Sequence, residues 1–146
     1  MQIEQRLEQL GIVLPEVKPP MFSFVPWVRS GHLVFVSGQV SSLKGKLGRD
    51  VSTEQGYHAA REVAIRIIAV LKDAVGDLDR VGRAVKLLGM VNSMPDFEEQ
   101  PKVINGASDL LLEVFGDRGK HARSAVGMAQ LPFSSSVEIE GIFEVG

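Results

Sequence analysis

Apolar residues recur along the chain at two spacings, one typical of helices and one typical of strands. From about Ser52 onward they fall three and four positions apart, as on the buried face of an amphipathic helix. This stripe consists of Ala60, Val63, Ala64, Ile67, Ile68, Leu71 and Val75. The spacing of Ser52 and Gln55 fits a capping box at its start, and Gly76 supplies a stop. A second stripe predicts a helix over Val103–Phe115.

Strands are predicted where apolar residues alternate with polar ones or run almost without interruption. Residues 22–28 and 32–39 read as an antiparallel hairpin around Ser30-Gly31. Residues 81–92 form a long strand that is apolar on both faces apart from two basic side chains, as expected in the centre of a sheet. Two more strands are predicted within residues 122–145, separated by turn residues.

The last of these strands carries acidic side chains on one face. Glu138, Glu140 and Glu144 alternate with apolar residues, and a row of this kind usually faces solvent. We assign that ordinary role to Glu140 and Glu144. Glu138 begins the strand beside a turn, where a side chain can face a cleft, and Arg123 begins the strand that we expect to be its partner.

The order of elements favours an α+β fold. A short amphipathic helix near the N-terminus and a proline-rich linker form an extension over residues 1–20, and the order after it is ββαβαββ. Such an order places both helices on one face of a mixed sheet. With 146 residues, 45% of them hydrophobic, the chain fits a single domain, 1–146. The other face of the sheet would be an apolar patch, so we expect a partner to cover it.

Composition excludes several classes of function. The net charge of −2 and the scattered basic residues offer no surface for nucleic acid. There is no cysteine, and His32, His58 and His121 lack the spacing of metal ligands, so no metal is expected. No apolar run approaches the roughly 20 residues of a membrane span. The charged N-terminus is unlike a signal peptide, which favours a cytoplasmic protein.

Two motifs resemble those of a known family. Arg123-Ser124-Ala125-Val126 is followed by Leu131-Pro132 and then Val137-Glu138-Ile139-Glu140, with Arg123 and Glu138 separated by 138 − 123 = 15 positions. Phe35-Val36-Ser37-Gly38-Gln39 is the second motif. Together they resemble the Rid/YjgF family, also called L-PSP, of small trimeric imine and enamine deaminases. The resemblance runs from about Pro26 to Val145 and leaves the N-terminal extension outside it.

The resemblance implies a fold, an assembly and a reaction. The fold is chorismate-mutase-like, and the assembly is a homotrimer with clefts between subunits. The reaction is hydrolysis of small reactive 2-imino or 2-enamino acids to 2-keto acids and ammonia, without a cofactor. Arg123 suits the carboxylate of such a ligand, since a guanidinium matches a carboxylate with two parallel donors. Glu138 is the candidate that positions water and transfers protons.

Further residues match the family's cleft, and each has a structural alternative. Ser37 and Gly38 are candidates for ligand contact, or for a strand end or bulge that needs small residues. Asn105 is a candidate for binding, or for a structural hydrogen bond. Trp27 matches an aromatic residue of the cleft, although a single tryptophan is often core filling. The alternative for Arg123 is an ion pair with Glu138 or Asp117.

Two departures from the family pattern bear on the substrate. Ala125 stands where deaminating members commonly have cysteine, and Trp27 stands in place of tyrosine. These point to a subgroup distinct from the best-known deaminases. Two rival functions stay open: a trimer that binds small carboxylates without turnover, and the ribonuclease or translation-inhibitor activity attributed to some members, which the acidic balance disfavours.

Overall fold

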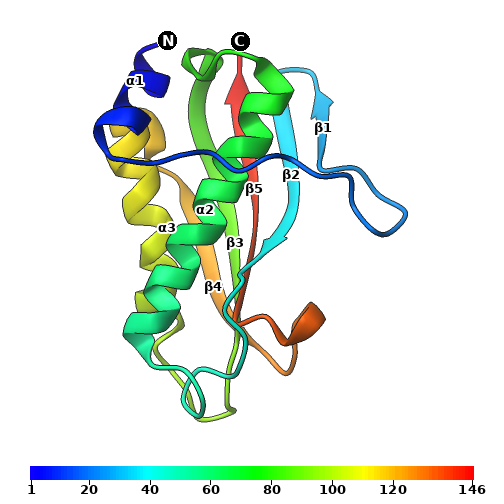
Figure 1. The fold of residues 1–146 in the computed structure, drawn as a ribbon, viewed down its shortest axis with the longest axis vertical. Coiled ribbons are helices and arrows are strands. Elements are labelled where there is room, and N and C mark those ends of the chain that lie inside the picture. Colours follow the sequence, from blue (N-terminus) through cyan, green and yellow to red (C-terminus); the bar gives the residue numbers. More distant parts are fainter.

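The computed structural model describes residues 1–146 and has two long helices packed on one face of a five-stranded sheet, as Figure 1 shows. The elements are α1 (Gln2–Gln9), β1 (Trp27–Ser30), β2 (Leu33–Val40), α2 (Thr53–Val75), β3 (Val81–Asn92), α3 (Gln100–Phe115), β4 (Ala122–Met128) and β5 (Val137–Val145). The strands lie in the order β1-β2-β5-β3-β4, and only β3 and β4 run parallel. The predicted α+β class, helix layer and element order are confirmed.

Helix α2 forms as its local signals predict. The Ser52 hydroxyl accepts a hydrogen bond from the Gln55 backbone N–H at 3.1 Å, and the Gln55 side chain accepts one from the Ser52 N–H at 2.9 Å. These bonds satisfy two donors that have no partner inside the helix. Every residue of the predicted stripe is buried against the sheet or α3. Gly76 ends the helix with a φ of +79°, a conformation that suits glycine.

Helix α3 begins earlier than predicted. The sequence predicts a helix from Val103, but the helix starts at Gln100 and Pro101 falls in its first turn. Proline is suited to this position because the N–H that it lacks would have no helical partner there. Gly106 lets α3 approach α2 closely, since a Cβ at this position would overlap the backbone carbonyl of Tyr57.

The first hairpin is shorter than predicted. Residues 22–26 do not join the sheet, and β1 begins only at Trp27, directly after Pro26. Proline cannot donate a ladder hydrogen bond, which explains why the strand begins after it. The turn is at Gly31, whose φ is +61°, as the sequence indicates.

The two C-terminal strands do not pair with each other. We expected β4 and β5 to be partners because their connection is short, but β3 lies between them and bonds to both. β5 buries every second side chain and occupies the interior of the sheet. β4 has no fully buried side chain, as befits an edge strand. Burial, more than the length of the connection, therefore decides which strand lies inside.

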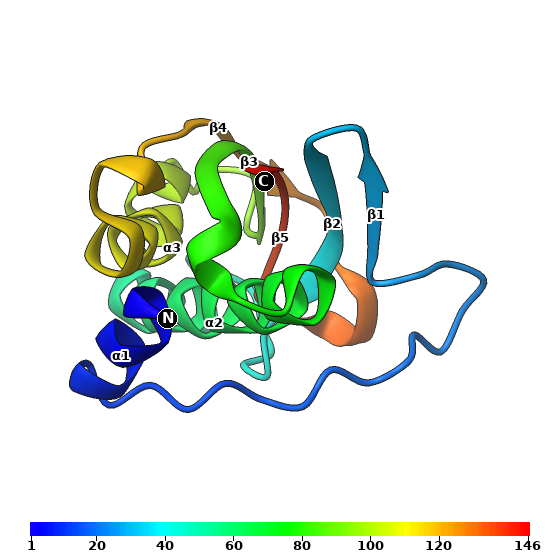
Figure 2. The same ribbon diagram turned by 90° about the horizontal axis from the view of Figure 1, so that it is seen from above.

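The two faces of the sheet differ, and Figure 2 shows the helices on one side only. On the open face Val28, Phe35 and Ile142 lie in register across β1, β2 and β5. Val28 and Phe35 are exposed, by 53% and 41%, and so is Val126 on β4. The open face thus carries apolar side chains together with acidic residues of β5 and the basic residues Arg83 and Lys86 of β3.

The N-terminal extension crosses the helix layer. Ile3 and Leu7 of α1 are buried, and Glu4 accepts a hydrogen bond from Lys72 of α2 at 2.9 Å. The segment between α1 and β1 then runs over α2, as Figures 1 and 2 show. None of the helices is both long and apolar enough to span a membrane.

Candidate functional site

Arg123 lies on the edge strand β4 and points to the helix side of the sheet. It is in register with Leu87 of β3, a core residue. Its guanidinium donates to the Ser108 hydroxyl at 3.0 Å and to the Pro101 carbonyl at 3.1 Å, both on α3. Neither acceptor carries a charge. The predicted alternative, an ion pair of Arg123 with Glu138 or Asp117, is wrong, because Arg123 forms no ion pair within the chain. Asp117 pairs instead with Lys120 at 3.2 Å.

Ser108 connects Arg123 to a histidine. His121 Nδ1 lies 2.6 Å from the carbonyl oxygen of Gly119, and its Nε2 lies 2.9 Å from Ser108 Oγ. A carbonyl can only accept, so in the neutral ring the proton is on Nδ1 and Nε2 accepts. The Ser108 hydroxyl then donates to His121 and accepts from Arg123. Three polar groups are therefore held in one chain of hydrogen bonds.

These groups line an open hollow of about 320 Å³ between α3 and β4, which we name the Arg123 hollow. Its lining residues are Asn105, Ser108, Asp109, Leu112, Lys120, His121 and Arg123. The Asp109 carboxylate accepts a hydrogen bond from the Tyr57 hydroxyl at 2.7 Å, and this bond raises the pKa of Tyr57. The one acid of the hollow thus has a neutral hydrogen-bond partner, and Arg123 likewise has only neutral partners.

Glu138 lies on the opposite face of the sheet. Glu138 is in register with Met90 of β3, and Arg123 is in register with Leu87 of the same strand. Because side chains alternate along a strand, Met90 and Leu87 point to opposite faces, and Leu87 points to the helices. Burial raises the pKa of Glu138, and the charge of Glu140 raises it further. Within one chain, the structure therefore does not bring Arg123 and Glu138 together. A site containing both needs a second copy of the chain.

Ser37 and Gly38 form a β-bulge in β2. The pairing with β5 skips them between Val36 and Gln39, and a Cβ on Gly38 would overlap the Glu138 carboxylate. The Ser37 N–H donates to the Pro26 carbonyl at 2.9 Å and its hydroxyl donates to the Val25 carbonyl at 2.6 Å. The motif thus forms the bulge that was its structural alternative. The bulge brings Gly38 into contact with Glu138.

The other predicted site residues divide between the two edges of the sheet. Asn105 is exposed and lines the Arg123 hollow. Ala125 shares a sheet face with Arg123, two positions along, and packs against the core. Trp27 lies on β1 at the far edge, where its Nε1 donates to Asp73 on α2 at 2.8 Å. Trp27 therefore lies far across the sheet from the Arg123 hollow of its own chain.

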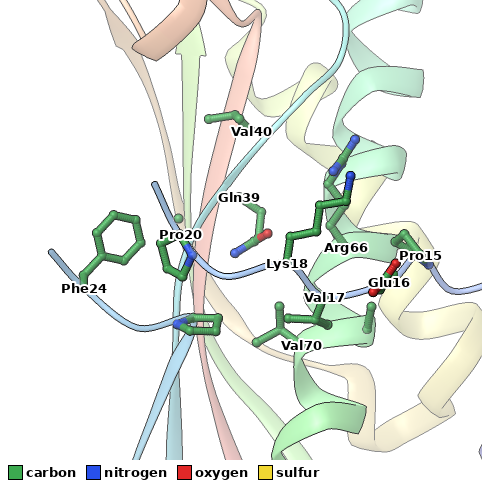
Figure 3. A pocket seen from close by; sticks show the side chains of 13 residues that line it. Pro15, Glu16, Val17, Lys18, Pro20, Phe24, Gln39, Val40, Arg66 and Val70 are labelled. Atoms are coloured by element: carbon green, nitrogen blue, oxygen red, sulfur yellow. The ribbon is translucent and has the colours of Figure 1, made fainter. Parts of the chain in front are cut away.

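A larger hollow of about 510 Å³ lies beneath the N-terminal segment, between α2 and β2 (Figure 3). Gly38 and Gln39 line it, together with Arg66, whose guanidinium donates to Ser42 at 3.1 Å and to Glu62 at 3.3 Å. Burial alone would raise the pKa of Glu62, but hydrogen bonds from Ser42 and Arg66 outweigh it and hold this pKa below its ordinary value. Arg66 Nε is buried without a hydrogen-bond partner, yet the charge is balanced by Glu62. We call this the larger hollow.

One acidic cluster has the density of a metal site. Oxygens of Glu4, Asp77 and Asp79 lie within 4.8 Å of one another. Lys72 and the terminal amine of Met1 pair with members of this cluster, so its charge is largely balanced within the chain.

Sequence reasoning missed Ser108 and His121. A signal for His121 was present, because residues 121, 123 and 125 share the alternation of a strand and therefore one face. No local signal identifies Ser108, which lies 13 positions before His121 on a helix. Only the packing of α3 on β4 brings them together.

The chain matches, over residues 4–143, the family model described as "YjgF/chorismate_mutase-like, putative endoribonuclease". It belongs to the YjgF/chorismate-mutase-like family. This agrees with the motifs around Ser37-Gly38 and Arg123, and with the fold, but the match begins at residue 4 and so includes most of the N-terminal extension that we expected to lie outside it.

Several known proteins resemble the chain along nearly its whole length. Protein TCP17 of Trypanosoma cruzi is 44% identical over 151 residues, covering 99% of this chain and 94% of that protein. The crystal structure of Atu1372 from Agrobacterium tumefaciens, a protein of unknown function, has a TM-score of 0.92 at 46% identity, covering 99% of this chain and 92% of that one. A "putative endoribonuclease" from Shewanella oneidensis has a TM-score of 0.94 at 35% identity, covering 98% and 99%.

Proposed function

We propose that the chain hydrolyses small 2-imino or 2-enamino acids to 2-keto acids and ammonia, with Arg123 holding the substrate carboxylate. One observation carries the proposal. The Arg123 guanidinium is half-buried beside an open hollow and is held only by neutral acceptors, so its charge is available to a ligand. A partly buried cation without a counter-ion favours an anion that can desolvate with it.

The geometry around Arg123 suits a small carboxylate. The bonds to Ser108 and Pro101 hold the guanidinium in one orientation, so less freedom is lost when a ligand binds. Asn105 lines the same hollow and can donate or accept at the ligand's nitrogen. Imine hydrolysis already proceeds in water, so holding the substrate in one orientation is sufficient to accelerate it. Orientation alone accounts for a large share of many rate enhancements.

Glu138 enters this proposal from a second copy of the chain. Its raised pKa makes it better able to exchange a proton near neutral pH than an ordinary carboxylate. The apolar open face supports a homotrimer, because exposed Val28 and Phe35 would be covered by neighbouring subunits. In a closed ring, the Glu138 of one subunit can approach the Arg123 hollow of the next.

A change on the open face tests the trimer. Phe35→Lys places a charge among apolar side chains and should convert the assembly to monomers, measured by light scattering after size-exclusion chromatography. Val13→Lys, at a position 88% exposed on the N-terminal segment, is the matched control and should leave the mass unchanged. A wild-type protein that is already monomeric at micromolar concentration would contradict the trimer.

The reaction is tested by generating imino acids in situ with an amino-acid oxidase and following their loss with and without the protein. The wild type should accelerate the loss and Arg123→Ala should not. Binding of 2-keto acids without any acceleration would favour the carboxylate-binding alternative. Cleavage of RNA that persists in Arg123→Ala would instead support the activity in the family's description.

A further inference from the structure

We propose that Ser108 and His121 form a proton-transfer pair of the Arg123 hollow, with the Ser108 hydroxyl facing the ligand and His121 as its proton partner. The inference rests on the proposed function and deepens it. Glu138 lies on the other face of the sheet, whereas His121 lines the hollow in which Arg123 lies.

The hydrogen bonds give the pair a defined direction. The Gly119 carbonyl, 2.6 Å from Nδ1, holds the ring proton on that nitrogen and leaves Nε2 free to accept. Nε2 is 2.9 Å from Ser108 Oγ, so the hydroxyl proton points to the ring. A nucleophile or water-activating hydroxyl, a base and a group that orients the base are the parts of a general-base site.

Arg123 takes part in the same arrangement. Its N–H donates to Ser108 Oγ at 3.0 Å, and a cationic donor stabilises negative charge that develops on this oxygen when its proton moves to His121. The arginine that would anchor the carboxylate thus also prepares the hydroxyl beside it. Ser108 is almost fully buried, which keeps bulk water from competing for its hydrogen bonds.

The proton balance of imine hydrolysis fits such a pair. As water attacks the imine carbon, a C–O bond forms and the C=N electron pair moves to nitrogen. One water proton passes through the Ser108 hydroxyl to His121 Nε2, and the imidazolium returns a proton to the nitrogen. In the second half the new hydroxyl gives its proton to the pair, nitrogen takes it, and the C–N bond breaks with its electron pair leaving in ammonia. Both water protons end on nitrogen, and no oxidant or reductant is needed.

Charged groups on α3, β3 and β4 surround His121. Asp109 on α3, Lys120 before β4, Arg123 on β4 and Arg83 on β3 line the hollows that contain His121. Asp109 accepts from Tyr57, and the other three are cations. Of the groups that line these hollows, His121 is the one whose ring nitrogen accepts from the Ser108 hydroxyl.

The test compares His121→Gln with a matched control, His58→Gln, which changes an exposed histidine on α2 outside the hollow. Glutamine accepts a hydrogen bond near the position of Nε2 but does not carry a proton between partners. His121→Gln should lower kcat for imino-acid hydrolysis about 100-fold, change KM by less than about 3-fold, and flatten one limb of the pH–rate profile. His58→Gln should match the wild type.

Several outcomes overturn the inference. An unchanged kcat and pH profile in His121→Gln, with an active wild type, would remove the proton-transfer role and leave the proposed function intact. A wild type that accelerates nothing would overturn the proposed function, and the proton-transfer role with it. Nitrogen-15 NMR adds a check without turnover: the neutral His121 ring should carry its proton on Nδ1, and a proton on Nε2 would contradict the pair.

Discussion

The two hollows of this chain differ in what their charges do. In the larger hollow, Arg66 is balanced by Glu62, which also accepts bonds from the Ser42 backbone and hydroxyl at 2.8 and 2.6 Å. In the smaller Arg123 hollow, the guanidinium has only neutral partners. The larger hollow has the greater volume, but its arginine is used to hold the loop after β2 on α2, and its other charged residues, Glu16 and Lys18, are exposed on the N-terminal segment.

The difference teaches that chemistry, more than volume, identifies the candidate site. A charge that is paired inside the chain stabilises the fold, and a ligand must displace its partner to use it. A charge without a counter-ion is available to a ligand. Changes in the larger hollow should therefore alter stability, and changes in the Arg123 hollow should alter ligand binding.

The largest expected effect is on affinity. Arg123→Ala should weaken the binding of a 2-keto acid about 100-fold, because two charge-assisted hydrogen bonds are lost at roughly 1.5 kcal/mol each. The melting temperature should change little, since the side chain is half-exposed. Arg66→Ala should show the opposite pattern, with lower stability and unchanged affinity, by titration calorimetry and thermal unfolding. Equal losses of affinity in both variants would remove the distinction between the hollows.

Glu62 provides the next effect, on stability. Glu62→Gln should lower the free energy of unfolding by about 1–3 kcal/mol, because it removes an acceptor of charged and backbone donors next to partly buried Arg66. The pKa of Glu62 is lowered in the fold, so this contribution is present above the unfolded-state pKa and is lost as pH falls through the folded-state pKa. Glu113→Gln, in an exposed pair with Arg61, is the control and should change stability by less than about 0.5 kcal/mol. Denaturant titration measures the free energy of unfolding of both variants. Equal losses would show that the pair of Arg66 and Glu62 contributes no more to stability than an exposed pair.

A side chain at Gly38 is expected to displace the Glu138 carboxylate. Gly38→Ala should cost about 1 kcal/mol of unfolding free energy, because its methyl group overlaps the Glu138 carboxylate and this side chain must turn into a less favourable rotamer. Gly82→Ala on β3 is the matched control, since a Cβ there meets its nearest atom at an ordinary 3.6 Å. If the two variants are equally stable by urea unfolding, the contact between Gly38 and Glu138 is not a tight one.

The smallest effect concerns the pH dependence of Glu138. Its pKa in the fold is raised above the ordinary value of 4.5, so the folded protein binds this proton more tightly than the unfolded chain. The group therefore favours folding below about pH 4.5 and loses that contribution as pH rises through the folded-state pKa. Glu138→Gln should stabilise the protein by less than about 1 kcal/mol at pH 7, after allowance for solvent exposure, and the gain should vanish near pH 3. A variant that is less stable than the wild type at pH 7 would contradict the sign.

Much of the fold could be predicted because its signals are local. The capping box at Ser52, the stripe of α2 and the glycine stop at Gly76 lie next to the residues that they organise. The bounds of β3 follow from one long apolar run that only Arg83 and Lys86 interrupt. The exceptions are the starts of α3 and β1, where proline acts in opposite ways. Pro101 is accepted in the first turn of α3, whereas Pro26 delays the start of β1 to Trp27.

The site was only half predictable because it depends on long-range packing. Arg123 and Glu138 stand 15 positions apart in the sequence, but β3 separates their strands and the pleat turns them to opposite faces. Ser108 and His121 become neighbours only because α3 packs along β4. Motif spacing identified Arg123, whereas the groups that surround it follow from topology.

A crystal soaked with a 2-keto acid tests the central claim most directly. We predict density for the ligand in the Arg123 hollow, with its carboxylate against the Arg123 guanidinium and its carbonyl carbon within reach of the Ser108 hydroxyl. Density in the larger hollow beside Arg66, with the Arg123 hollow empty, would contradict the account.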